Sequence, residues 1–179
     1  FYKIQGTFMM CQAPRYDRGN MLNDDGDTPM YKRILAPIDG SETSDFAVQE
    51  AIKLAADQHA DLRFIHVMEE TYLPYTEGYI DIAVLRDAVR QQGHRILGKS
   101  TALATQAGLK CEQALLEAHG ERASRIIVDD AKQWGANVIV MGTHGRRGFD
   151  HMIFGSLAEG VVRFSPLPVL LVRGGEAQQ

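Results

Sequence analysis

Glycine and small polar residues near the C-terminal end of the chain have a spacing that suits phosphate binding. The segment Gly142-Thr143-His144-Gly145 follows the apolar run Val138 to Met141, and Gly155-Ser156 comes after nine further residues. The pattern from Leu157 to Phe164 is helical. A strand that ends in a glycine-rich loop and leads into a helix brings backbone N–H groups and the positive end of the helix dipole together. These residues therefore predict a phosphate-binding site, and with it the binding of a nucleotide.

Composition narrows the class of protein. The chain has 179 residues, 45% of them hydrophobic, and a net charge of -4 at pH 7, which fits a single domain with one sizeable core. Its basic residues are scattered, so we expect no nucleic-acid partner. Only Cys11 and Cys111 are present, too few for a disulfide framework or a zinc site, and this fits a reducing cytoplasm. No apolar run approaches the roughly 18 residues of a membrane span, so we predict a cytoplasmic protein with no membrane partner.

Residues 1–29 differ from the rest of the chain. They begin with Phe1, lack hydrophobic periodicity and end in a stretch rich in Asn, Asp and Gly before Met30. We interpret them as a leader or a cloning remnant that is poorly ordered, with a docking arm as the alternative. The nucleotide-binding domain is predicted to span residues 30–179.

From residue 30 onward, short apolar runs alternate with segments of helical periodicity. Five such alternations without an internal repeat are typical of an α/β protein with a parallel sheet and helices on both faces. The predicted strands cover residues 34–38, 62–68, 110–116, 137–141 and 168–172, and the predicted helices cover residues 41–59, 81–107, 122–134 and 156–164.

Two of these strands end in turns with the character of a ligand site. Pro37-Ile38-Asp39-Gly40-Ser41 follows the strand at 34–38, and the glycine segment from Gly142 follows the strand at 137–141. Ligands of open α/β sheets lie at the carboxyl ends of the strands, where the winding reverses. If these two strands are neighbours, both turns open into one crevice, and the Asp39 carboxylate faces the phosphate-binding site.

Three segments, in order and each at a predicted strand end, resemble the universal stress protein family in its ATP-binding branch. They are Pro37 to Ser41, His66-Val67, and the intact motif Gly-x2-Gly-x9-Gly-Ser from Gly142 to Ser156. The resemblance covers residues 30 to about 173. It implies a single-domain, flavodoxin-like open parallel five-stranded sheet in the order 3-2-1-4-5 with helices on both faces. It also implies a homodimer, bound ATP and a regulatory role in the stress response.

Carried over by position, the resemblance implies that Asp39 lies on the ribose side of the nucleotide and that the backbone of Val67 meets the adenine edge. Glycine at 142, 145 and 155 would leave room for the phosphates. Mg²⁺ or Mn²⁺ would be held through the phosphates, with no catalytic or metal-ligating residue assigned. Arg146 is the nearest plausible phosphate cation and Arg147 the second, while Gly148 adds a glycine inside the nine-residue spacer. The predicted nucleotide-binding residues are Pro37, Ile38, Asp39, Val67, Met141, Gly142, His144, Gly145, Arg146, Gly155, Ser156 and Leu157.

Several residues have simpler interpretations. His66 lies within a strand and is predicted to be a hydrogen-bonded core histidine, whereas His144 is predicted to be functional and His151 to be an ordinary loop residue.

Gly93 to Ser100 satisfies the letters of the P-loop pattern, and Ile126 to Asp129 imitates the strand that accompanies it. Both stretches have helical periodicity, so we reject a P-loop and expect a continuous helix.

Two classes of function remain. The first is a regulatory ATP-binding protein, and the alternative is a slow ATPase or nucleotidyl-transfer enzyme, for which only Asp39 and His144 are candidate groups. We reject a receiver domain, because the sequence lacks the acidic cluster that such a domain has at its first strand. A flavin-binding electron carrier is a remote third possibility. The apolar strand Pro168 to Val172 is expected at a sheet edge, where a second copy of the chain would cover it and form a homodimer.

Overall fold

The computed structural model describes residues 3–4, 7–10, 29–69, 82–144 and 154–174. Within these residues, strands and helices alternate as the periodicity predicts, and the boundaries differ from the expected ones by one or two residues. The strands are β1 (Lys3–Ile4), β2 (Thr7–Met10), β3 (Arg33–Pro37), β4 (Asp61–Glu69), β5 (Cys111–Ala118), β6 (Val138–Gly142) and β7 (Val169–Val172). The helices are α1 (Glu42–Gln58), α2 (Ile82–Gln106), α3 (Ala123–Trp134) and α4 (Ser156–Phe164).

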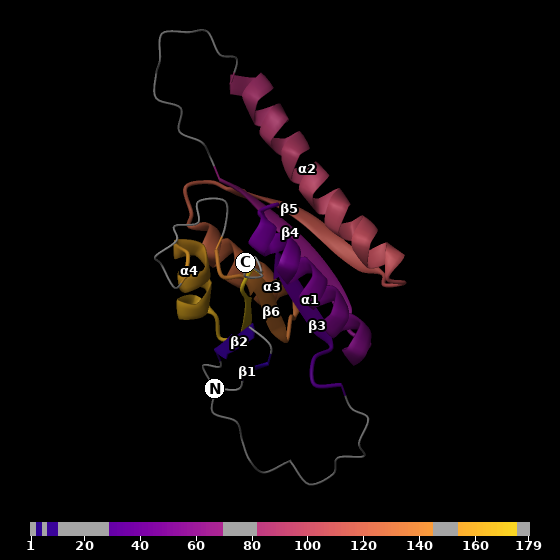
Figure 1. Cartoon of the computed structure of the whole chain (residues 1–179). Helices are drawn as coiled ribbons and strands as arrows, with labels where there is room; N and C mark the ends of the chain where they lie inside the picture. The colour runs from indigo at the N-terminus through magenta and orange to yellow at the C-terminus, as the bar shows by residue number, and fades with distance from the viewer. Residues whose placement is uncertain (1–2, 5–6, 11–28, 70–81, 145–153, 175–179) are drawn as a thin grey trace, which may run out of the picture.

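All seven strands belong to one sheet in the order β1-β2-β7-β6-β3-β4-β5 (Figure 1). The five strands from β3 to β7 run parallel to their neighbours within that set. Counted from β3, their order is 3-2-1-4-5, which confirms the predicted topology. The first and fourth of these strands, β3 and β6, are therefore neighbours, and their carboxyl ends lie at the same edge of the sheet.

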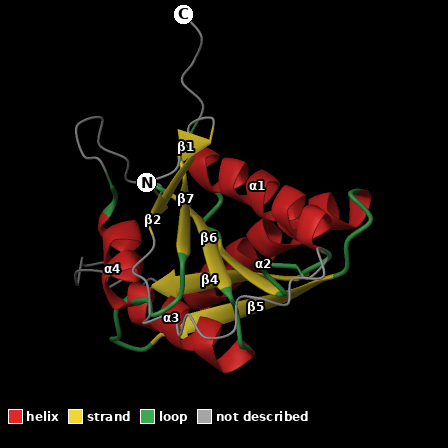
Figure 2. Ribbon diagram, turned by 90° about the horizontal axis from the view of Figure 1, so that it is seen from below, coloured by secondary structure: helices red, strands yellow, loops and turns green. Residues whose placement is uncertain are grey.

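The sheet separates two hydrophobic clusters, one on each face. Alternate residues of β3 divide between them, because Ile34 and Ala36 contact the cluster beneath α1 and α2, whereas Leu35 contacts the cluster beneath α3 and α4. Figure 2 shows the sheet between these two helix pairs. Burial on both sides explains why the central strands are continuous apolar runs.

The segment that imitates a P-loop is part of helix α2, and its partner stretch Ile126 to Asp129 lies inside helix α3. The structure therefore confirms that residues 93–100 form no P-loop and that residues 126–129 form no strand. Gly93 has a packing role, because a Cβ atom at this position would lie 2.5 Å from Cδ1 of Leu115 and 3.0 Å from Cδ2 of His66. The glycine lets α2 lie close against β4 and β5.

The N-terminal residues contribute two short strands that the sequence analysis did not predict. Strand β2 pairs antiparallel with β7, from Thr7 opposite Val172 to Met10 opposite Val169, and β1 pairs with β2. Strand β7 therefore has β6 on one side and β2 on the other. The expectation that Pro168 to Val172 forms a free sheet edge is wrong, because a segment of the same chain takes that position.

In the part of the chain that the structure describes, no helix combines the length and the apolar character needed to cross a lipid bilayer.

Candidate nucleotide-binding site

The carboxyl end of β3 continues into a tight turn that leads into helix α1. The Asp39 carboxylate atom Oδ1 accepts hydrogen bonds from the backbone N–H and the hydroxyl of Ser41, at 2.9 and 2.6 Å. Ser41 in turn caps α1, since its Oγ accepts from the backbone N–H of Ser44 at 3.2 Å. Gly40 has a φ of 77°, which glycine adopts most readily. These bonds fix the half-buried carboxylate at the end of β3, where the sequence analysis expects a ligand.

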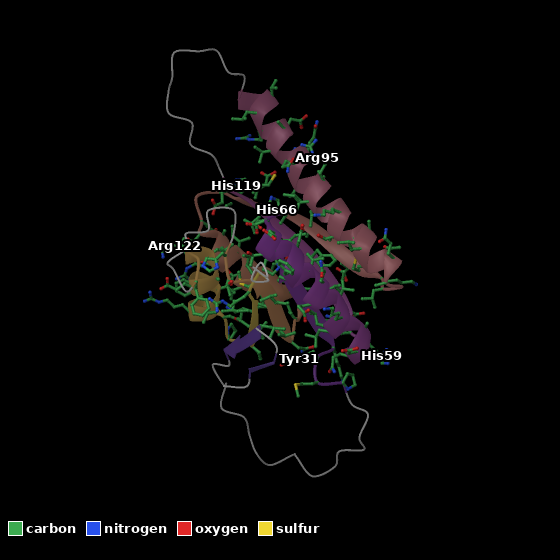
Figure 3. The ribbon with its side chains drawn as sticks, viewed as in Figure 1. Tyr31, His59, His66, Arg95, His119 and Arg122 are labelled. Carbon is green, nitrogen blue, oxygen red and sulfur yellow. The ribbon has the colours of Figure 1, made fainter. Side chains whose placement is uncertain are left out.

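The neighbouring strand β4 supports this turn from inside the molecule. The Nδ1 atom of His66 lies 2.7 Å from the carbonyl oxygen of Ile38, and because a carbonyl can only accept, Nδ1 is the donor. His66 is 8% exposed, so the prediction of a hydrogen-bonded core histidine is confirmed. The half-buried Val67 follows, with its side chain packed against the cluster beneath α3 and α4. Figure 3 shows His66 in the middle of the molecule.

On the other side of β3, strand β6 ends in Met141 and Gly142, which are both buried. A Cβ atom at Gly142 would lie 3.0 Å from Cγ2 and 3.1 Å from the backbone carbonyl carbon of Thr43. The direction in which a side chain would point at this position is therefore filled by the first turn of α1. The glycine at this position therefore makes room for the first turn of α1.

Two backbone hydrogen bonds bring the start of α4 to the end of β6. The N–H of Thr143 donates to the carbonyl of Val172 at 2.9 Å, and the N–H of Gly155 donates to the carbonyl of Thr143 at 2.8 Å. The half-buried His144 has its Nδ1 3.1 Å from the hydroxyl oxygen of Thr143. Gly145, Arg146, Arg147, Gly148 and His151 lie outside the described residues.

Helix α4 begins with features that favour an anion. Gly155 is its N-cap residue, with extended backbone angles of -70° and 154°, and no side chain caps the helix. The first N–H groups of an α-helix have no partner within the helix, and the helix dipole adds positive potential there. The hydroxyl-bearing Ser156 is exposed and Leu157 is half-buried. This helix start can therefore bind a phosphate, as the motif predicts.

Two pockets open beside these strand ends. A pocket of about 230 Å³ lies against α1 and α2, and its lining includes Ile38, Gly40, Arg95 and Lys99. A second pocket, of about 460 Å³, lies against α3 and α4 and shares Ser156 and Leu157 with the predicted site. The second pocket also includes Arg122 and Ser124, which the sequence analysis missed. Their one signal in the sequence is that they follow shortly after the strand predicted at 110–116, whose carboxyl end lies at the same edge of the sheet.

The described residues contain no group of three or more His, Cys, Asp or Glu side chains that could hold a metal ion. A cation held through nucleotide phosphates needs no such group, and the Asp39 carboxylate lies at the strand end where the nucleotide is expected.

The fold defines an open α/β protein in which β3 and β6 are neighbours and two pockets lie beside the carboxyl edge of the sheet. The model of the universal stress protein family matches residues 30–173, and the chain belongs to this family.

Individual relatives agree over nearly the same length. The chain is 34% identical over 155 residues to universal stress protein YxiE of Bacillus subtilis, covering 80% of this chain and all of that protein. A solved universal stress protein from Burkholderia pseudomallei is 36% identical with a TM-score of 0.65, covering 80% of this chain and 96% of that one. A universal stress protein solved in complex with cAMP is 25% identical with a TM-score of 0.61, covering 82% of this chain and 99% of that one.

Proposed function

We propose that this universal stress protein binds ATP in the crevice between the ends of β3 and β6 and acts as a regulatory protein of the stress response. The observation that carries the proposal is the meeting of two features on neighbouring strands. One is the fixed carboxylate of Asp39, and the other is the α4 start, which the bond from Gly155 to Thr143 holds against β6. The related protein solved with cAMP supports an adenine nucleotide as the ligand class.

In this proposal each part of the nucleotide meets a group of matching chemistry. The Asp39 carboxylate accepts from ribose hydroxyls, and the backbone of Val67 reads the adenine edge. The N–H groups at Ser156 and Leu157 bind the phosphates. The remaining contacts come from residues that line the crevice or that the family motif assigns: Pro37, Ile38, Met141, Gly142, His144, Gly145, Arg146 and Gly155. ATP brings the Mg²⁺ or Mn²⁺ with it, held through its phosphates.

The regulatory role is preferred over catalysis because the two candidate catalytic groups are engaged in structural contacts. Asp39 Oδ1 accepts two hydrogen bonds from Ser41, and His144 Nδ1 lies against Thr143. Phosphoryl transfer needs a base or a water-orienting group aligned with the phosphate. The hydrogen bonds of Asp39 and His144 orient these side chains toward Ser41 and Thr143 instead. A slow ATPase is the alternative. Multiple-turnover phosphate release that is lost in Asp39→Ala would favour it.

The test of binding is calorimetric titration of the purified chain with ATP, with Asp39→Asn as the variant. Asparagine keeps the shape of the side chain but loses the charge, so we expect weaker binding by about tenfold, as for one hydrogen bond to a charged group. Asp57→Asn, an exposed aspartate on α1, is the matched control and should bind like the unaltered chain. Absence of ATP binding by the unaltered chain would refute the proposal.

We further propose a homodimer through β7 and a cytoplasmic location, the latter because two cysteines are too few for a disulfide framework. Because β2 pairs with β7, a second copy can pair with β7 only after β2 has left that edge. Dimerisation is then in competition with the N-terminal strands.

A further inference from the structure

The pocket between α1 and α2 has the features of a binding site apart from the predicted phosphate-binding residues. Of the predicted nucleotide-binding residues that the structure describes, its lining includes Ile38 alone, and Ile38 belongs to the hydrophobic cluster beneath α1 and α2. The start of α4 borders the other pocket, which lies against α3 and α4. The polar side chains that line the α1–α2 pocket are Ser44, Asp45, Gln92, Arg95, Lys99 and Ser100.

Arg95 brings to this pocket a positive charge without an ion-pair partner. It lies near the middle of α2 (Figure 3). Its Nε and Nη2 atoms donate to Gln92 Oε1 at 3.1 and 2.8 Å, and the side chain of glutamine is neutral. Arg95 forms no ion pair with any residue that the structure describes. Because a guanidinium has five N–H donors, Arg95 retains donors with which to bind an anion.

The second cation of the pocket is already paired. Lys99 Nζ lies 2.6 Å from Asp45 Oδ2, and this ion pair joins α2 to the first turn of α1. The lining therefore carries two cations, Arg95 and Lys99, against the carboxylate of Asp45, a formal net charge of +1. The whole chain carries -4. The pocket is thus a positive position on an acidic protein, which favours an anionic ligand.

Two buried hydroxyl groups line the same pocket. Ser44 is 4% exposed and Ser100 is 3% exposed. Ser44 Oγ accepts from the backbone N–H of Asp39 at 3.2 Å, and no described residue accepts the proton of this hydroxyl. Ser100 Oγ donates to the carbonyl of Ile96 at 3.4 Å, longer than the roughly 2.5–3.0 Å of an ordinary O–H···O bond. Both hydroxyls can therefore donate to an oxygen atom of a ligand.

The volume of the pocket limits the size of that ligand. It is about 230 Å³, below the roughly 300–1,000 Å³ of pockets that hold drug-sized molecules. Donors outnumber acceptors in the lining, because the carboxylate of Asp45 and the amide oxygen of Gln92 already accept from Lys99 and Arg95. A small oxyanion, either phosphate or a short dicarboxylate, matches both the size and the donors, since its oxygens suit the planar guanidinium.

We propose that the α1–α2 pocket binds a small oxyanion and that Arg95 is the cation that holds it. The guanidinium of Arg95 donates to the anion, and the hydroxyls of Ser44 and Ser100 donate to its other oxygens. This site goes beyond the proposed nucleotide binding and does not depend on it.

Calorimetric titrations of the full chain with sodium phosphate and with sodium succinate, each with and without saturating ATP, test the proposal. We expect at least one anion to bind and its binding to persist with ATP, because the pocket includes no residue of the α4 start. The stronger ligand identifies the anion as a phosphate or a carboxylate. In Arg95→Gln the affinity for that anion should fall by about tenfold, the loss of one charge-assisted contact. Arg86→Gln, an exposed arginine of the same helix outside the lining, is the matched control.

Ser100→Ala provides a second readout. Alanine favours a helix, so the melting temperature should not fall, whereas the affinity for the anion should. The proposal is overturned if the unaltered chain binds neither anion, if ATP abolishes anion binding, or if Arg95→Gln and Arg86→Gln bind the anion equally well. If the chain binds the anion but no ATP, the proposed function fails and the comparison of Arg95→Gln with Arg86→Gln still decides this inference. Circular dichroism of each variant verifies that the fold is intact.

Discussion

The Nδ1 atom of His66 lies 2.7 Å from the carbonyl oxygen of Ile38, so a buried side chain of β4 holds the backbone immediately before Asp39. Replacing His66 with leucine leaves that carbonyl without its donor. We expect a loss of about 1–3 kcal/mol in the free energy of unfolding, the usual effect of an unsatisfied buried group. We also expect weaker ATP binding, because the Asp39 turn loses its support. Urea unfolding and calorimetry measure the two effects.

His94→Leu is the matched control for that change. His94 is exposed on α2, and its replacement should leave both the unfolding free energy and ATP affinity close to those of the unaltered chain. Equal stability of His66→Leu and His94→Leu would contradict the role given to His66.

The contact between Gly142 and Thr43 predicts opposite results for two glycine-to-alanine changes. Gly142→Ala places a Cβ atom 3.1 Å from backbone atoms of Thr43, and we expect about 1–3 kcal/mol of destabilisation, as for other overpacked sites. Gly98→Ala, in helix α2, meets nothing within 4 Å and should stabilise the protein by up to about 1 kcal/mol. Thermal unfolding of the two variants compares them directly, and a stabilised Gly142→Ala would show that the contact can relax without cost.

The ion pair between Arg63 and Asp130 is largely buried and incompletely satisfied. Arg63 Nη2 lies 3.0 Å from Asp130 Oδ1, while Arg63 Nε and Asp130 Oδ2 are buried without a partner among the described residues. Arg63→Met leaves the carboxylate alone, and we expect about 3–5 kcal/mol of destabilisation. The double variant Arg63→Met/Asp130→Leu removes both charges and should recover much of that loss.

The fluorescence of the single tryptophan of the chain can measure the stability of these two variants. Trp134 donates from Nε1 to Glu112 Oε1 at 3.1 Å and lies 5.8 Å from the Arg63 guanidinium. Its fluorescence therefore reports the unfolding of this region in urea. A double variant as unstable as Arg63→Met would contradict the expectation.

The pair formed by Arg90 and Glu117 predicts a pH dependence of stability. Arg90 Nη2 lies 2.6 Å from Glu117 Oε1, and this hydrogen bond holds the pKa of Glu117 below its ordinary value of 4.5. A lowered carboxyl pKa contributes stability that is present above the ordinary pKa and lost as the pH falls through the folded-state pKa. The stability difference between the unaltered chain and Glu117→Gln should therefore be largest near neutral pH and vanish in acid. Urea unfolding across this range measures it, and a difference that grows in acid would contradict the assignment.

Competition at β7 predicts a change of oligomeric state. Met9 lies opposite Leu170 in the β2–β7 pair. The substitution Met9→Pro removes a backbone donor and therefore disfavours β2. We expect light scattering to show a larger dimer fraction for Met9→Pro than for the unaltered chain, with Lys3→Ala as the control. Equal dimer fractions for Met9→Pro and the unaltered chain at every concentration would contradict the competition between β2 and a second copy for β7.

The alternation of strands and helices could be predicted because each element has a local signature, such as the apolar run at Val138 or the helical spacing that rejected the P-loop at Gly93. The two N-terminal strands could not, because β1 and β2 are too short to show periodicity and are defined by pairing with a distant strand. The same limit applies to the site. Asp39 stands in a recognisable turn, whereas Arg122 and Ser124 depend on how two helices separated in sequence approach each other.

The hydrogen bond from Gly155 to Thr143 holds the N-cap residue of α4 beside the end of β6. Because this bond joins the two ends of the segment between residues 143 and 155, lengthening the segment adds little loop-closure entropy. An insertion between these two residues should therefore leave β6 and α4 folded while it breaks the nine-residue spacing of the glycine motif, so it would separate the stability of the fold from the binding of ATP.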